Sequence, residues 1–105
     1  ASINIAKQQI QYDKLKQDID AGIVKAYKDF ELSEKMLQLN EENVQIAAEN
    51  VQITMERYRL NQSTSLDIKQ AQSSYEDALY NVILARYNSK VAEIELKRII
   101  NNLLD

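Results

Sequence analysis

The chain has 105 residues, 13 Lys or Arg against 16 Asp or Glu, and a formal net charge of −3. One glycine and no proline argue against a sandwich, a barrel or an α/β domain of this length, because their many tight turns draw on both residues, so an all-α protein is predicted. No cysteine and no histidine are present, which argues against an enzyme, a cofactor and a metal site.

The first predicted helix runs from about residue 2 to residue 60. A glycine inside a helix costs about 1 kcal/mol, which packing can offset, so both a continuous helix and a break at Gly22 stay open. Small and apolar side chains recur every three and four residues, the a/d pattern of a coiled coil. This first seam consists of Phe30, Ser33, Leu37, Asn40, Val44, Ala47, Val51, Thr54 and Tyr58.

A second apolar stripe follows the same helix with a period of seven residues. It lies two residues further along, and this offset rotates it by about 200°, to nearly the opposite flank. An arc rich in Glu, Gln and Lys lies between the two stripes and must be solvated. The second stripe consists of Leu32, Leu39, Ile46, Ile53 and Leu60.

A turn is predicted over residues 61–64, where small polar residues interrupt the periodic pattern. Asn61 is suited to the left-handed conformation that ends helices. Thr64 and Asp67 have the spacing of a capping box, and the Asp67 carboxylate suits the positive end of a helix that begins near Ser65.

The second predicted helix covers about residues 65–104 and has two stripes as well. Its first seam has alanine at successive d positions, which lets a neighbouring backbone approach closely, so we expect a long antiparallel coiled-coil hairpin. That seam consists of Ile68, Ala71, Tyr75, Ala78, Val82, Ala85, Ser89, Ala92, Leu96, Ile99 and Leu103. The other stripe consists of Tyr80, Leu84, Tyr87, Val91 and Ile94.

A hairpin buries one seam per helix, so the remaining stripes require further helices. We therefore expect this chain to self-associate. Either a four-helix bundle formed by two copies or a closed, curved wall of helices with two wet faces would satisfy both stripes. Polar Asn43, Asn50, Asn81 and Asn88 beside the stripes favour the wall, although asparagines that only set the register would look the same.

The acidic balance argues against nucleic acid as a partner, because phosphate binding needs clustered Lys and Arg. No apolar run approaches the ~20 residues of a membrane-spanning helix. The tyrosines fall on the stripes without interleaved basic residues, which indicates packing rather than base stacking.

The segment from Glu56 to Ile68 resembles the outer-membrane efflux protein family of TolC-like conduits, whose pattern is approximately E-R-Y-x-x-G-x-x-S-x-L-D-V. Ala85-Arg86-Tyr87 downstream and the run from Val24 to Phe30 upstream resemble further elements of the same family. The resemblance covers nearly the whole chain. One departure is Asn61, which stands where the family has Gly and tolerates the same backbone conformation.

The resemblance implies a trimeric conduit with a barrel in the outer membrane and a long periplasmic α-barrel. Residues 1–105 would be a single hairpin of that larger α-barrel domain, in the periplasm. In this family the conduit is a passive route for export. An inner-membrane pump drives the export, and a periplasmic adaptor protein joins the conduit to the pump.

The same resemblance places the adaptor docking site at the tip of the hairpin. The expected contact residues are Tyr58, Leu60, Asn61, Gln62, Ser63 and Thr64. Two alternatives stay open, namely the helical hairpin of an adaptor protein and a structural coiled coil unrelated to efflux.

Overall fold

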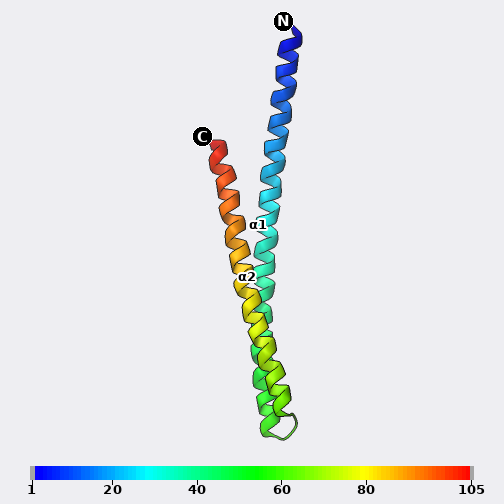
Figure 1. The fold of residues 1–105 in the computed structure, drawn as a ribbon, viewed down its shortest axis with the longest axis vertical. Helices are drawn as coiled ribbons and strands as arrows, with labels where there is room; N and C mark the ends of the chain where they lie inside the picture. Colours follow the sequence, from blue (N-terminus) through cyan, green and yellow to red (C-terminus); the bar gives the residue numbers. More distant parts are fainter. Residues whose placement is uncertain (1, 105) are drawn as a thin grey trace.

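The structure, a computed structural model, describes residues 2–104. Two antiparallel helices account for nearly all of this range, α1 (Ser2–Arg59) and α2 (Ser65–Leu104), with a short loop between them (Figure 1). The molecule measures 89 × 21 × 14 Å, so it is a rod rather than a globule. The predicted all-α hairpin is confirmed, with boundaries within one residue of those expected.

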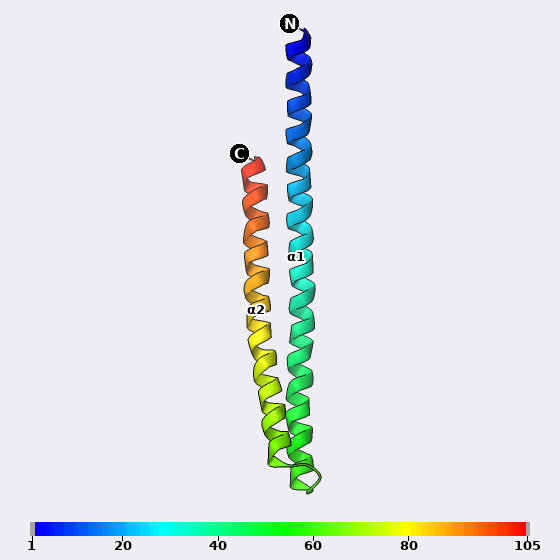
Figure 2. The same ribbon diagram turned by 45° about the vertical axis from the view of Figure 1, so that its right-hand side comes forward.

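The long helix α1 is continuous through Gly22, so the break that the sequence left open does not occur. Since α1 has 58 residues and α2 has 40, the N-terminal part of α1 extends beyond the end of α2 (Figures 1 and 2). Leu103 lines a shallow groove together with Ile19 and Ile23, which marks the level where α2 ends.

The helices meet along the first seam of each, as predicted. Ala26 in α1 and Ala71, Val82, Ala85 and Ser89 in α2 are buried, and most other seam residues are half-buried. Because these residues are mostly small, the two backbones come close together and the core between them is thin.

Both ends of the seam differ from the prediction. Tyr58 is 49% exposed and Leu103 is 44% exposed. Tyr58 lies in the last turn of α1, next to the loop. Leu103 lies where α2 has tilted away from α1, although α1 continues past that level (Figures 1 and 2). Periodicity places a residue on a face but does not show where the two helices diverge.

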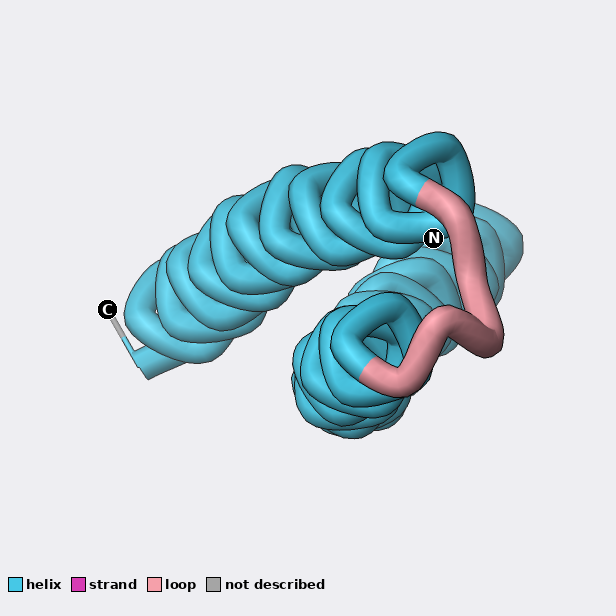
Figure 3. Tube along the Cα trace, turned by 90° about the horizontal axis from the view of Figure 1, so that it is seen from below, coloured by secondary structure: helices cyan, strands magenta, loops and turns pink. Residues whose placement is uncertain are grey.

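The seam is uneven across its width. Ala47 and Ala78 line a groove on one side of the hairpin, whereas Val44 and Val82 line a groove on the other side. Alanine therefore faces alanine on one side and valine faces valine on the other. Viewed from the loop end, the helices are not parallel, and α2 tilts away from α1 toward its C-terminal end (Figure 3).

The loop begins with a Schellman motif, the standard hydrogen-bonded end of a helix. The N–H of Gln62 donates to the carbonyl of Arg57 at 2.7 Å, and the N–H of Asn61 donates to the carbonyl of Tyr58 at 3.0 Å. Asn61 has a φ of 58°, so the predicted left-handed residue is confirmed. The motif turns the chain sharply at the end of α1.

The capping box at the start of α2 is also confirmed. The N–H of Asp67 donates to Thr64 Oγ1 at 3.1 Å, and the N–H of Thr64 donates to Asp67 Oδ2 at 3.0 Å. Each bond pairs a backbone donor that the first turn of a helix would otherwise leave without a partner.

Candidate functional site: the hairpin tip and the exposed stripes

The predicted docking residues lie together at the closed end of the hairpin, because they are consecutive in the loop and the last turn of α1. Leu60, Asn61, Gln62 and Thr64 are exposed, and the Leu60 side chain is 60% exposed although it is apolar. Leu60 therefore adds an exposed apolar side chain to an otherwise polar loop.

Ser63 differs from its neighbours. It is half-buried, and its Oγ donates a hydrogen bond of 3.0 Å to the carbonyl of Thr54 in α1. This bond ties the loop back to the helix. The Thr64 hydroxyl accepts the bond from Asp67 described above. Both hydroxyls therefore hold the loop in shape, and the freely exposed groups of the tip are those of Leu60, Asn61 and Gln62.

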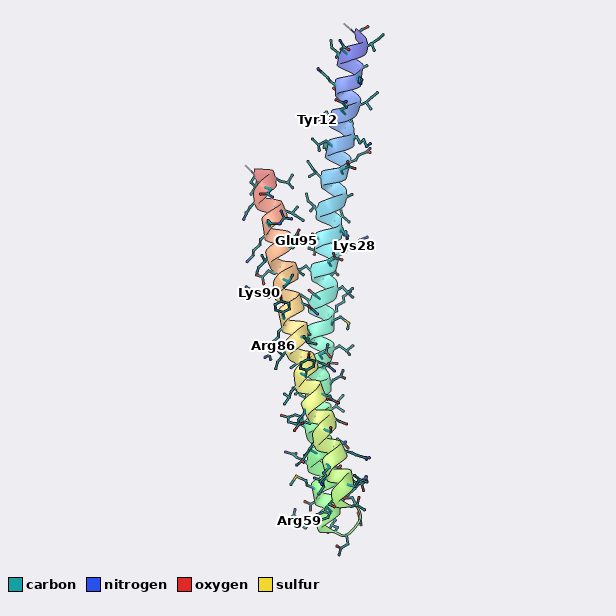
Figure 4. The ribbon with its side chains drawn as sticks, viewed as in Figure 1. Tyr12, Lys28, Arg59, Arg86, Lys90 and Glu95 are labelled. Atoms are coloured by element: carbon teal, nitrogen blue, oxygen red, sulfur yellow. The ribbon has the colours of Figure 1, made fainter. Side chains whose placement is uncertain are left out.

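Two tip residues were missed by the sequence analysis. Leu66, at the start of α2, is 61% exposed and adds a second apolar side chain to this end of the hairpin. Arg59 lies at the tip and forms an ion pair with Glu56 (Figure 4). The available signal for Leu66 was its spacing, because it lies two heptads before Tyr80 and so continues the second stripe of its helix to the tip.

The second stripes of both helices are exposed along the whole hairpin. In α1 the stripe residue Ile46 is 63% exposed, and in α2 the stripe residue Tyr87 is 67% exposed. No stripe residue is buried. Each helix therefore has five exposed apolar side chains aligned on one flank, a pattern typical of a contact surface rather than of singly scattered surface residues. The α1 stripe is Leu32, Leu39, Ile46, Ile53 and Leu60, and the α2 stripe is Tyr80, Leu84, Tyr87, Val91 and Ile94.

Asparagines line one of the two long sides of the hairpin. Two adjoining grooves on that side share Asn40 and Asn81. We call this side the asparagine face, and define it by Asn40, Asn43, Asn50, Asn81 and Asn88. The opposite side, which we call the charged face, is defined by Glu41, Gln45 and Arg86.

The ionised groups pair along the helix surface. Lys97 contacts Glu93 at 2.8 Å and Lys35 contacts Glu31 at 3.7 Å, which are the acid-before-base pairs typical of exposed helices. The hydrogen bond from Lys97, with Lys90 nearby, lowers the pKa of Glu93.

The carboxylate of Glu95 behaves in the same way, because the hydrogen bond from Arg98 lowers its pKa. Both shifts result from ion pairs within one helix surface. Among residues 2–104, no three acidic, His or Cys side chains come together in a way that could hold a metal ion.

Neither helix, within the described range, has a stretch long and apolar enough to cross a membrane. Comparison with curated proteins and with solved structures gave no match. The model of one protein family, described as outer membrane efflux protein, matches residues 1–102. This match includes both helices, the loop and the two exposed stripes, and the chain therefore belongs to the outer membrane efflux protein family.

Proposed function

We propose that this hairpin forms two neighbouring helices in the periplasmic wall of an outer-membrane efflux conduit. Three copies of the complete protein would form the conduit, and substrates would pass through it without chemical change. Family membership supports this role. The observation that carries it furthest is the pair of exposed apolar stripes, because a helix in a closed wall needs one contact stripe for each of its two neighbours.

We also propose that the tip docks a periplasmic adaptor protein, which connects the conduit to an inner-membrane pump. The contact residues are Tyr58, Leu60, Asn61, Gln62, Ser63 and Thr64, of which Ser63 and Thr64 chiefly hold the loop. Leu60 offers an apolar contact, and Gln62 offers an amide that can donate and accept hydrogen bonds. The alternative role as an adaptor hairpin draws no support from the family match.

The docking proposal is tested by photo-crosslinking in cells that produce the complete protein. A photoreactive amino acid replaces Gln62 in one variant and Glu42 in the control, which is on α1 about 30 Å away along the helix. We expect the first variant alone to crosslink to a protein that mass spectrometry identifies as a periplasmic adaptor.

A second substitution separates docking from folding. Leu60→Asp places a charge on the exposed tip without touching the hydrogen bond of Ser63 to Thr54. We expect it to abolish the crosslink from position 62 while the native mass still shows a trimer, since burying an unpaired charge at a joint is costly. A crosslink of undiminished yield, or one to a protein of another class, would contradict the docking site.

A further inference from the structure

We infer that the asparagine face is the concave side of the helical wall and lines the water-filled interior of the duct. The charged face then forms the outer surface. This inference rests on the proposed function, because only a helix in a closed wall has an inside. It assigns which of the two wet faces of such a wall faces inward.

The first argument is the angle between the two contact stripes of each helix. We measure the angle from the midpoint between the a and d positions of the first seam to the second stripe, with the spacing of a coiled coil. Across the asparagine face this angle is about 130° in α1 and about 150° in α2. Measured across the charged face, both angles exceed 180°. A wall of helices curves toward the face across which the two contact stripes of each helix are separated by the smaller angle. In both α1 and α2 this is the asparagine face.

These angles also set the tightness of the curve. A turn of about 40° per helix closes a ring of on the order of ten helices. A closed tube of that size encloses a narrow channel and leaves no unpaired stripe at an edge. The exposed apolar stripes are therefore consistent with a wall that closes on itself.

The second argument is independent and comes from the seam within the hairpin. The residues on the asparagine side of the seam are Ala47 and Ala78, and those on the other side are Val44 and Val82. Small residues toward one face and larger ones toward the other form a wedge. A wedge of this kind narrows toward the inside of a curved wall, which again places the asparagines inside.

The polar groups of this face fit an aqueous lining, and the same grooves also hold the stripe residues Leu32, Ile46, Ile53 and Leu84. Asn43 and Asn50 in α1, and Asn81 and Asn88 in α2, lie seven residues apart, so each helix presents two amides on the same face in the middle of the hairpin. Amides keep water in the channel because they donate and accept hydrogen bonds. The residues that line the two grooves include carboxylates but neither Lys nor Arg. Hydrated solutes can therefore pass without binding to a fixed cation.

The test introduces single cysteines into the complete protein. This chain contains no cysteine, so each new thiol is unique within it. Asn43→Cys and Asn81→Cys lie on the asparagine face, and Gln45→Cys is the control on the charged face, one short step along the helix from Asn43. The protein is inserted into a planar lipid bilayer, and a cationic methanethiosulfonate reagent is added while the single-channel conductance is recorded.

We expect modification of Asn43→Cys or Asn81→Cys to lower the conductance at least about twofold, because the attached group occupies the channel, and modification of Gln45→Cys to leave it unchanged. A decrease with Gln45→Cys instead would overturn the inference and leave the conduit in place. The absence of any conductance in the unmodified protein would count against the conduit itself.

A second measurement does not depend on conductance. A maleimide attached to a bulky polymer is added to the assembled protein and, separately, to the protein unfolded in denaturant. We expect Gln45→Cys to react in both states, and Asn43→Cys to react at least about tenfold more slowly in the assembled protein, since the polymer does not enter a narrow duct. Equal reactivity of the two cysteines in the assembled protein would overturn the inference.

Discussion

Ser89 Oγ, in the buried seam of α2, donates a hydrogen bond of 3.1 Å to Glu34 Oε1 of α1. This bond joins two positions 55 residues apart in the sequence and ties the two helices together midway along the seam. Glu34 is exposed, so water can replace the bond at its carboxylate, whereas the Ser89 hydroxyl is buried and would be left without a partner.

Ser89→Ala is expected to lower the free energy of unfolding by about 1 kcal/mol, the net value of a typical hydrogen bond, because the exposed Glu34 carboxylate stays solvated. Glu34→Gln retains an acceptor oxygen and is the matched control, with a smaller effect. Thermal unfolding followed by circular dichroism at a fixed protein concentration measures both. Equal loss in the two variants would mean that the charge of Glu34, rather than the bond, matters.

Asn61 holds the turn in a left-handed conformation, with a φ of 58°. Asn61→Gly should be neutral or slightly stabilising, because glycine adopts this conformation without a steric penalty. Asn61→Val should cost roughly 1 kcal/mol or more, since a β-branched side chain clashes with the backbone there. Chemical denaturation compares the three proteins, and a valine variant as stable as the parent would contradict this account of the turn.

Gly22 lies within the continuous helix α1, and a Cβ built there would meet nothing within 4 Å. Gly22→Ala should therefore raise stability by up to about 1 kcal/mol, because alanine restricts the unfolded chain and has the higher helix propensity. Gly22→Pro is the opposing control and should break the helix. The increase in helical circular dichroism on Gly22→Ala is the direct measurement, and a decrease would show that flexibility at this point belongs to the native helix.

Ala71 is 4% exposed, whereas Ala78 is only half-buried and borders the groove of the asparagine face. Ala71→Leu should lower stability by about 1 to 3 kcal/mol, because the larger side chain forces the helices apart. Ala78→Leu should cost clearly less, since its side chain can turn into the groove. Melting temperatures of the two variants decide the point, and the reverse order would place Ala78 in the tighter part of the seam.

The exposed stripes predict that the chain self-associates when studied by itself. Light scattering at high concentration should give a mass above the 12.1 kDa of one copy. Leu39→Gln, Ile46→Gln and Ile53→Gln together should shift the mass back toward one copy, because they remove apolar surface from the α1 stripe.

The matched control for that experiment changes the solvated arc of the same helix. Gln38→Ala, Gln45→Ala and Gln52→Ala lie one residue before each stripe position and should leave the mass unchanged. A parent chain that stays at the mass of one copy at every concentration would contradict the prediction.

Local sequence determined the helices, their ends and the face on which each residue lies. The capping box of Thr64 and Asp67 and the left-handed Asn61 depend on hydrogen bonds and sterics within a few residues, so spacing alone predicted them. The seam was predicted because periods of three and four residues select one face of a helix. The sequence left open whether the helix continues through Gly22, because a glycine penalty of about 1 kcal/mol can be offset by packing that the sequence alone does not show.

Only the tertiary structure decided how the two helices meet. The bond of Ser63 to Thr54, the exposure of Tyr58 and the side of the seam on which the alanines lie all depend on the register and tilt of α2 against α1. Register follows from the sum of many contacts between residues far apart in the sequence, so no single spacing predicts it. The asparagines could be placed on a helix from the sequence, but that they line one shared face became visible only when both helices were in position.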